Sequence, residues 1–242
     1  MYVIAETFWL PKEGYTSAEY EDAYYSNYLS NNNLIVFHGA VADGATETSF
    51  AAQWAQILVR AYCEEPLNRD NLINNLPALQ QQWIAQVTTK PLPWYAEEKL
   101  RRGACSALVG LTLFQENQRG EALAIGDSCL FHISQDQLKN CFPLQHSQFF
   151  DNTPFLLSSN QSQNALLSEQ ICQLEMRWQV GDEFYLMTDA LASWFLQEYE
   201  RKRKPWRQLR QLNQNQFPGW IIELRETSAL KNDDVTLMRI FL

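Results

Sequence analysis

The residues of this chain that could do chemistry are carboxylates at the ends of apolar stretches. Asp43 follows the run LIVFHGAVA, Asp127 follows ALAIG, and Asp189 follows FYLMT. Asp22 precedes a tyrosine-rich stretch, and Asp233 precedes the apolar stretch VTLMRIFL by one residue. An ionised carboxylate at the end of a buried strand loses hydration, which costs several kcal/mol unless another group compensates the charge.

Two interpretations of these carboxylates are open. Taken singly, an Asp after a strand is a turn former or a helix N-cap, and each acid then needs its own explanation. Taken together, the carboxylates would lie close to one another if the ends of their strands meet. A divalent cation would then be the simplest way to compensate their negative charge. Mg²⁺ and Mn²⁺ both prefer such hard oxygen ligands.

The elements that must position these carboxylates follow from the periodicity of the apolar residues. Alternating or continuous apolar runs predict strands at residues 2–10, 22–29, 34–42, 105–114, 121–125, 129–133, 171–178, 183–188 and 235–242. Helical spacing, as in Phe50, Trp54 and Ile57, is typical of an amphipathic helix. Helices are predicted at about 50–61 and 70–87. A short helix ends at about 102, another helix begins at about 191, and two more cover 206–212 and 219–226.

The order of these elements predicts the fold class. Hairpin-connected strands and helices are segregated along the sequence, which favours an α+β fold over repeated βαβ units. At roughly 150 residues per domain, 242 residues could form one large domain or two small ones. No Pro/Gly/Ser-rich linker divides the chain, so we expect a single domain over 1–242. Residues 145–170, rich in Ser, Asn and Gln, predict an irregular surface segment.

Charge and cysteine content exclude several classes of function. The chain has 19 Lys and Arg against 28 Asp and Glu, a net charge of −9. Such a surface repels phosphate backbones and anionic lipids, so no nucleic-acid or membrane partner is expected. Five cysteines without CxxC spacing indicate neither a disulfide framework nor a zinc site. With no basic n-region and no apolar run near the ~18 residues of a membrane span, we expect a soluble cytoplasmic protein.

A series of motifs carries a family resemblance. AEYEDAYY, AVADGA, ACSAL, AIGDS, VGDEFYLMTDAL and NDDVTLM follow one another along nearly the whole chain. In order and spacing they resemble the motifs of the protein phosphatase 2C family, the metal-dependent serine/threonine phosphatases, and indicate a divergent bacterial-type member. The resemblance implies a four-layer α/β/β/α sandwich of two antiparallel sheets, with a two-metal centre at one end.

The resemblance also implies the catalytic ligands. Asp43 would bridge two divalent cations, Mg²⁺ or Mn²⁺, and the Gly44 carbonyl would complete the coordination of one of them. Asp189 and Asp233 would hold the other cation. A water bridging the two metals would attack phosphorus of phosphoserine or phosphothreonine in line, without a covalent intermediate.

The remaining acids have implied supporting roles. Asp22, with Glu21 beside it, would act by direct or water-mediated contact, and Asp127 resembles the ligand of a third, weaker metal. Asp234 stands where the family usually has asparagine and adds an acid next to Asp233. The implied partners are a phosphoprotein substrate and a cognate serine/threonine kinase system, whereas the oligomeric state is left open.

Two further departures from the family pattern concern phosphate binding and proton donation. Many members carry an arginine four residues before the Glu of the Glu-Asp pair, where this chain has Ser17, and Lys12 is a nearby cation that could bind phosphate instead. Ala45 stands where some members have a histidine proposed as general acid, so solvent or metal-bound water would protonate the leaving group. Two functions stay open: a working phosphatase, or a catalytically weak relative that binds phosphoproteins as a regulatory module.

Weaker signals have simpler interpretations. The sequence around Asp127, GDS, also resembles a lipase-like esterase block, but no histidine base follows His146. His38 and His132 lie inside apolar runs and are expected to be buried core residues. The basic run at 201–204 is interpreted as a solvated helix end, with a docking patch for an acidic partner as the alternative.

Overall fold

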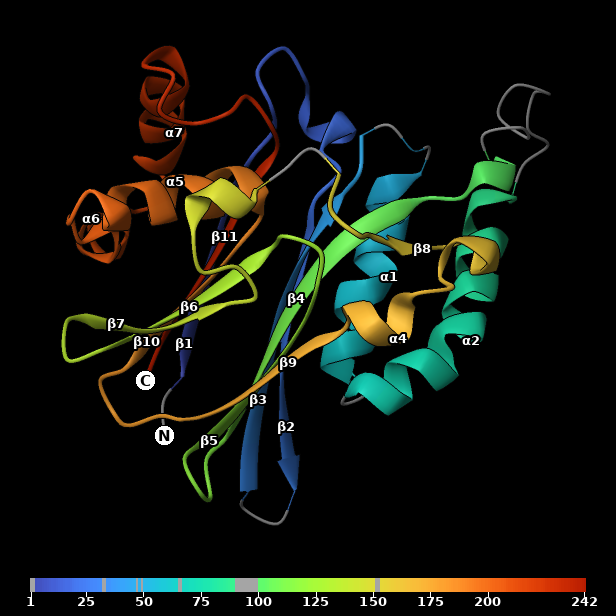
Figure 1. Cartoon of the computed structure of the whole chain (residues 1–242), viewed down its shortest axis with the longest axis horizontal. Helices are drawn as coiled ribbons and strands as arrows, with labels where there is room; N and C mark the ends of the chain where they lie inside the picture. The colour runs from blue at the N-terminus through green and yellow to red at the C-terminus, as the bar shows by residue number, and fades with distance from the viewer. Residues whose placement is uncertain are drawn as a thin grey trace.

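The computed structural model describes residues 3–31, 34–46, 48, 50–64, 67–89, 100–150 and 153–242. Its centre is a pair of antiparallel sheets that face each other (Figure 1). The first has the order β1 (Ile4–Leu10), β11 (Val235–Phe241), β10 (Glu183–Met187), β6 (Cys129–Ser134) and β7 (Gln137–Phe142). The second has the order β2 (Ala23–Asn31), β3 (Leu34–Gly44), β4 (Cys105–Phe114), β5 (Arg119–Ile125) and β9 (Cys172–Arg177).

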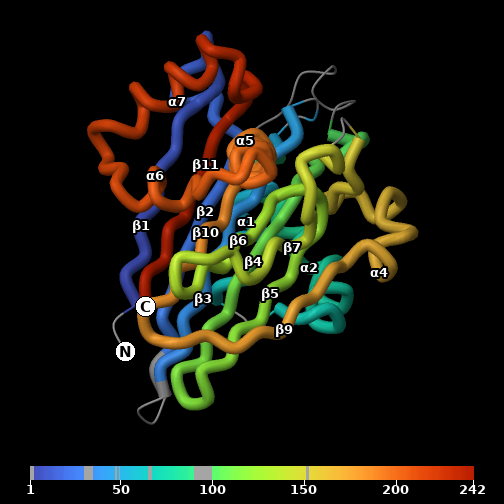
Figure 2. The backbone as a smooth tube through the Cα atoms, turned by 60° about the vertical axis from the view of Figure 1, so that its left-hand side comes forward, coloured from blue at the N-terminus to red at the C-terminus, as the bar shows by residue number. Residues whose placement is uncertain are grey.

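Helices cover the outer face of each sheet (Figures 1 and 2). Helices α1 (Ala51–Glu64) and α2 (Arg69–Val87) lie on the second sheet, with the short α4 (Leu167–Gln170) beside α2. Helices α5 (Asp189–Glu200), α6 (Pro205–Gln211) and α7 (Phe217–Glu226) cover the first sheet. The expected four-layer α/β/β/α sandwich is therefore confirmed. In the part of the chain that the structure describes, no helix combines the length and the apolar character that crossing a membrane requires.

Three apolar cores hold the layers together. Trp54 and Leu58 of α1 pack with Trp83 of α2 against the second sheet, as the spacing of the apolar residues predicts. A core between the sheets includes Phe37 and Leu186, and a third core lies under α5, α6 and α7. Strands β3 and β4 are buried on both faces, which explains their almost continuous apolar sequence. The strands that end at the carboxylates are thus fixed by packing on two sides.

The structure differs from the sequence prediction in a few elements. Strand β7, which forms a hairpin with β6, was not predicted. Its turn residues Gln135 and Asp136 both have positive φ, a conformation that usually shows in sequence as Asn-Gly or Asp-Gly. Most of the short helix predicted to end near residue 102 falls on 90–99, outside the described residues.

The segment predicted to be irregular contains short ordered pieces. It includes two 3-10 turns (Ser147–Phe149 and Gln161–Gln163), the two-residue strand β8 (Leu157–Ser158) and α4. Strand β8 pairs with Cys105 and Ser106 at the start of β4. This pairing attaches the segment to the same end of the second sheet at which β3 finishes.

Candidate metal centre

The predicted carboxylates lie near one another at one end of the sandwich, where β3 ends and α5 begins. Asp43 is the penultimate residue of β3, and Asp22 directly precedes the residue of β2 that pairs with Ala42. The first sheet contributes Asp189, where β10 passes into α5, and Asp233, in the turn before β11. Two sheets therefore supply acids to one site, as the shared-cation interpretation requires.

Asp43 has the most acidic surroundings of the site. Burial raises the pKa of Asp43 well above its usual range, and four neighbouring carboxylates raise it further: Asp22, Asp189, Asp127 and Asp233. The Asp43 side chain also lies within hydrogen-bonding reach of Asp189. Each of these acids disfavours ionisation of its neighbours, so the group as a whole favours a bound cation.

Asp22 has one oxygen that nothing in the described part of the chain satisfies. Its Oδ2 accepts a hydrogen bond from the Thr236 hydroxyl (2.7 Å), whereas its buried Oδ1 has no hydrogen-bond partner. Thr236 in turn accepts the phenolic hydroxyl hydrogen of Tyr20, and its backbone N–H donates to the Thr188 hydroxyl (3.0 Å). Burial raises the pKa of Asp22 well above its usual range despite the Thr236 hydrogen bond. This chain of hydroxyl groups fixes one carboxylate oxygen and leaves the other free to act as a ligand.

Asp189 and Asp233 share a cation already present in the chain. The ammonium of Lys231 lies 2.8 Å from Asp233 Oδ2 and 3.4 Å from Asp189 Oδ2. Asp189 Oδ1 accepts the N–H of Ala190 in the first turn of α5, where an acid is favoured by the helix dipole. Burial raises the pKa of Asp189, while Lys231 opposes the shift.

Asp234 has a structural role that the sequence did not reveal. Its Oδ1 accepts the backbone N–H of Lys12 (2.8 Å), and its Oδ2 accepts that of Glu21 (2.7 Å). One carboxylate thus holds the chain as it leaves β1 and again as it enters β2. The Lys12 ammonium donates to the Thr46 hydroxyl (2.9 Å) and lies 3.7 Å from Glu21.

Glycines permit close approaches of the backbone at two points of the site. A Cβ at Gly44 would overlap the carbonyl oxygen of Glu21, so β3 can approach the start of β2 only with glycine here. Gly126, directly before Asp127, has a φ of +87° and packs against Ala107. Asp127 is buried at the end of β5 and contributes to the acidic surroundings of Asp43.

The donor set fits a hard divalent cation chemically. All candidate ligands are oxygens, one buried oxygen of Asp22 is unpartnered, and the acids disfavour one another's ionisation. As the side chains stand, however, no three His, Cys, Asp or Glu among the described residues are grouped closely enough to hold an ion.

A cleft opens beside Asp189. It has a volume of about 570 Å³ and is lined by α5 residues, by Phe150 and by the loop that carries Lys231. Arg225 lines it too, donating hydrogen bonds to the carbonyls of Pro11 (3.0 Å) and Asp233 (2.6 Å). The cleft therefore continues from Asp189 toward the cationic side chains of Lys231 and Arg225.

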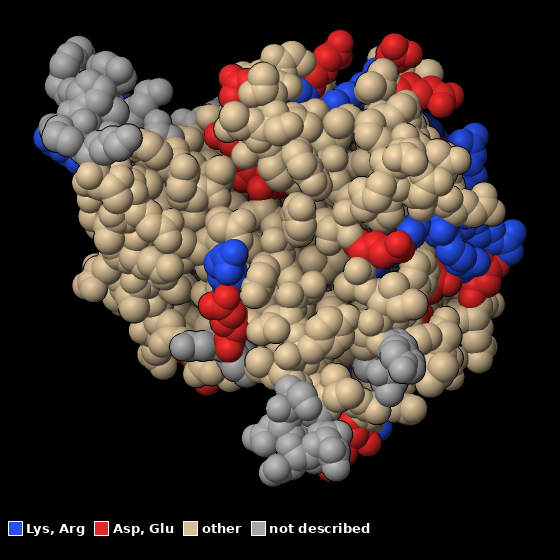
Figure 3. Space-filling view, turned by 180° about the vertical axis from the view of Figure 1, so that it is seen from behind, with Lys and Arg blue, Asp and Glu red and all other residues tan. Residues whose placement is uncertain are grey.

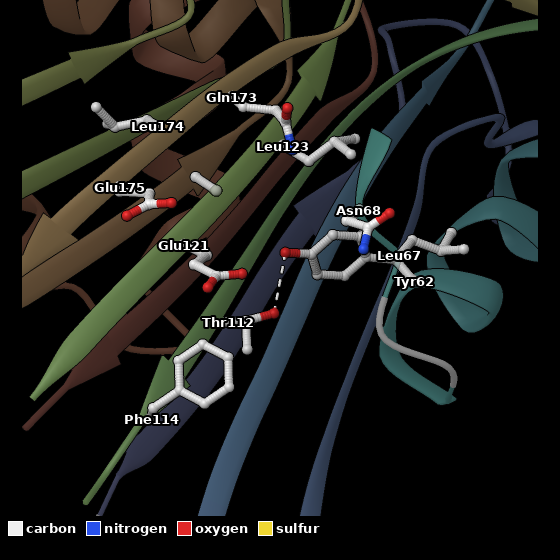
Figure 4. A pocket seen from close by; sticks show the side chains of 11 residues that line it. Tyr62, Leu67, Asn68, Thr112, Phe114, Glu121, Leu123, Gln173, Leu174 and Glu175 are labelled. Atoms are coloured by element: carbon white, nitrogen blue, oxygen red, sulfur yellow. Dashed lines mark hydrogen bonds between the residues drawn. The ribbon is translucent and has the colours of Figure 1, made fainter. Parts of the chain in front are cut away.

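A smaller cavity of about 190 Å³ lies away from the candidate metal centre, between α1 and the second sheet (Figure 4). Tyr62 and Thr112 line it, and their hydroxyl groups are hydrogen-bonded to each other (3.1 Å). Thr112 pairs with His38 in the middle of the sheet, far along β3 from Asp43. This cavity is separate from the candidate metal centre.

The weaker sequence signals have structural explanations. His38 and His132 are buried, as predicted, and His146 is exposed beside Glu200. In the basic run, Arg201 and Arg203 pair with Glu198, and Lys204 pairs with Asp136. On the face shown in Figure 3, basic side chains likewise alternate with acidic ones instead of forming a continuous patch. These pairings favour the solvated, ion-paired interpretation over a docking patch.

Comparison with known proteins gives the family. The model of the protein phosphatase 2C family matches residues 15–224, and the chain belongs to this family. None of the curated proteins compared with it matches significantly.

Solved structures share the fold. The Mycobacterium tuberculosis serine/threonine phosphatase PstP/Ppp is 18% identical, with a TM-score of 0.58 over 99% of this chain and 98% of that one. RsbX, solved in complex with magnesium, is 16% identical, with a TM-score of 0.53 over 98% and 94%. The catalytic domain of PstP in complex with two manganese ions is 17% identical, with a TM-score of 0.53 over 99% of both chains.

Sequence reasoning missed several residues of the site. Thr188 and Thr236 were inside the quoted motifs, directly before Asp189 and two residues after Asp234, but no role was assigned to them. Lys231 lies only two residues before Asp233, and its positive charge so close to an acid was the sequence feature that could have indicated the ion pair. No sequence feature indicated the role of Arg225. One of its carbonyl partners, on Pro11, is distant in sequence, and the other, on Asp233, lies in a turn.

Proposed function

We propose that this protein is a metal-dependent phosphoprotein phosphatase that acts on phosphoserine and phosphothreonine. The observation that carries the proposal is the placement of Asp43 among four other carboxylates contributed by both sheets. Family membership and the phosphatases of the same fold support hydrolysis of phosphoproteins. Complexes of those proteins with magnesium or manganese support divalent cations here, two of them in this proposal, and Asp127 would hold a third.

Each residue has a defined task in this proposal. Asp43 would help to hold both cations. The Gly44 carbonyl and the unpartnered Oδ1 of Asp22 would complete one of them, and Asp189 and Asp233 would hold the other. Bound divalent cations lower the pKa of water and neutralise the charge that develops on phosphoryl oxygens. Thr236 keeps Asp22 oriented, and Gly44 allows the two strands to approach.

Phosphate binding needs a replacement for the arginine that Ser17 does not provide. Lys12 is buried and hydrogen-bonded to Thr46, two residues beyond Gly44, so its charge is close to the proposed cations. We assign phosphate binding to Lys12, with Glu21 limiting its mobility. Lys12→Met should raise KM for a phosphopeptide by about 10- to 100-fold, because a hydrogen bond to a charged group contributes roughly 1.5–3 kcal/mol.

The remaining parts of the proposal concern the surroundings of the site. Residues 145–170 would act as a flap, since β8 pairs with β4 beside the site and Phe150 lines the cleft. The substrate would be a phosphoprotein of a serine/threonine kinase system. Free cysteines suit the reducing cytoplasm.

The test is hydrolysis of p-nitrophenyl phosphate and a phosphothreonine peptide with Mn²⁺, with Mg²⁺ and with EDTA. Turnover should require metal and should be absent in Asp43→Asn. A folded protein that binds Mn²⁺ but hydrolyses neither substrate would contradict the enzyme proposal. The result would favour the second candidate, a regulatory phosphoprotein-binding relative, which the serine at position 17 supports.

A further inference from the structure

The ammonium of Lys231 occupies the space between two carboxylates that the proposed function assigns to one metal ion. It lies 2.8 Å from Asp233 Oδ2 and 3.4 Å from Asp189 Oδ2. The Lys231 side chain is 60% exposed, whereas the side chains of Asp189 and Asp233 are only 17% and 26% exposed. The lysine side chain is therefore freer to move into solvent than the two more enclosed acids.

The backbone fixes the starting point of this lysine. Leu230 is buried, and its N–H donates to the Leu224 carbonyl at the end of α7. The N–H of Asp233 donates to the Lys231 carbonyl (3.0 Å), and Arg225 binds the Asp233 carbonyl. Lys231 and Asp233 therefore belong to one tight turn, from which the lysine side chain reaches α5 at Asp189.

An ammonium and a divalent cation held by the same two carboxylates repel each other, so each lowers the affinity of the pair for the other. The ammonium compensates one unit of charge through hydrogen bonds, whereas the metal needs the oxygens as ligands and repels the ammonium. An exposed ion pair contributes only about 0.2–1 kcal/mol, so sufficient metal displaces it.

We propose that Lys231 is a built-in competitor of the divalent cation at the Asp189–Asp233 pair, a role that rests on the proposed metal centre. The lysine lowers the affinity of the Asp189–Asp233 pair for metal more than it lowers the metal affinity of the part of the site that contains Asp43. The two cations then bind in order, and the second binds only at a higher free metal concentration. The site is therefore filled completely only above a threshold concentration of free Mg²⁺ or Mn²⁺.

The test is calorimetric titration of Mn²⁺ into the metal-free full chain, without substrate. Lys231→Met removes the charge and keeps the side-chain length, and Lys231→Arg keeps the charge. We expect the weaker Mn²⁺ site to bind about threefold to tenfold more tightly in Lys231→Met, from the loss of one or two such ion pairs. Lys231→Arg should remain close to the wild-type affinity, and Lys139→Ala, at an exposed position on β7, should not change it.

Two further variants separate the outcomes. Asp189→Asn should remove the weaker site and so identify it, while Asp43→Asn should weaken both. Unchanged or weaker Mn²⁺ binding in Lys231→Met, with wild-type turnover intact, would overturn the competitor role and leave the phosphatase proposal standing. If neither the wild type nor Lys231→Met binds Mn²⁺, both proposals fail.

Discussion

Asp43 and Asp234 use the same functional group in opposite ways. Both oxygens of Asp234 accept backbone N–H groups, which stabilises its charge without a cation. Asp43 instead lies among other carboxylates, and its pKa is raised by burial and by their charges. In the absence of metal, the first acid stabilises the fold and the second destabilises it.

Replacing Asp43 should therefore make the metal-free protein more stable while it abolishes turnover. Asn has nearly the same shape and cannot ionise, so the free-energy cost of burying an ionisable group among other carboxylates is removed. We expect the metal-free Tm at pH 7.5 to rise by roughly 2–4 °C, which corresponds to about 1 kcal/mol in a domain of this size. Thermal unfolding in EDTA measures the shift, with Lys139→Ala as a control; a lower Tm would show that Asp43 is compensated without metal.

His38 should make stability depend on pH. It is buried in β3, its Nδ1 is hydrogen-bonded to the Thr112 hydroxyl (3.0 Å), and burial lowers its pKa to about 4. Between its ordinary value of 6.5 and about 4, the unfolded chain binds a proton at His38 and the folded chain does not. Stability is therefore present above pH 6.5 and is lost as the pH falls through this window, by about 2–3 kcal/mol.

The measurement is the urea unfolding free energy at pH 7 and pH 4.5 for the wild type and for His38→Asn. Asn can keep a hydrogen bond to Thr112 but does not titrate. The unfolding free energy should change less between the two pH values in His38→Asn than in the wild type, by about 2–3 kcal/mol. An equal difference in both proteins would mean that His38 binds a proton in the folded state.

At the level of elements, the sequence predicts well where packing decides the pattern. The positions of β4, α1 and α2 follow from apolar periodicity, because each of these elements buries one stripe or both faces. Strand β7 escaped prediction because its positive-φ turn uses Gln135 and Asp136 without glycine. At the site, the acids were visible in motifs, but the partners Thr236, Lys231 and Arg225 depend on contacts between distant elements.

Gly110 determines how closely α1 approaches the second sheet. A Cβ at this position of β4 would overlap the ring of Tyr62, which is fully enclosed between α1 and the sheet. Gly110→Ala should cost about 2–3 kcal/mol by overpacking. Chemical denaturation measures the loss.

The matched control for Gly110→Ala is Gly219→Ala, where the added methyl group meets no neighbouring atom and α7 gains helix propensity. Tyr62→Leu in the Gly110→Ala background should recover part of the lost stability, since the two sites are in contact. Equal effects of the two Ala substitutions would show that α1 adjusts freely to the added volume.

At the level of the whole molecule, the candidate ligands belong to both sheets. Asp22 and Asp43 come from the second sheet, and Asp189 and Asp233 flank strands of the first. A cation bound by acids from both sheets would link the two halves of the sandwich directly. Unfolding, which separates the sheets, would then require release of the metal.

Mn²⁺ should therefore raise the Tm of the wild-type protein. A ligand at 100 times its Kd stabilises the folded state by about 2.7 kcal/mol, or roughly 5–10 °C here. Differential scanning fluorimetry with increasing Mn²⁺ follows the shift. Asp43→Asn should show little of it, and a full shift in that variant would mean that Mn²⁺ binds elsewhere.

The double hydrogen bond of Asp234 has a consequence for how this protein can diverge. Because one carboxylate holds the backbone at both Lys12 and Glu21, the residues between them form a loop closed at its base. Substitutions and insertions in that loop that spare Tyr20, whose hydroxyl group binds Thr236, would leave Asp22 and β2 in place. The loop includes Ser17, where the family resemblance implies an arginine, so its sequence can change without moving the ends of the loop. Substrate preference can then evolve, or be engineered, independently of the acids that it borders.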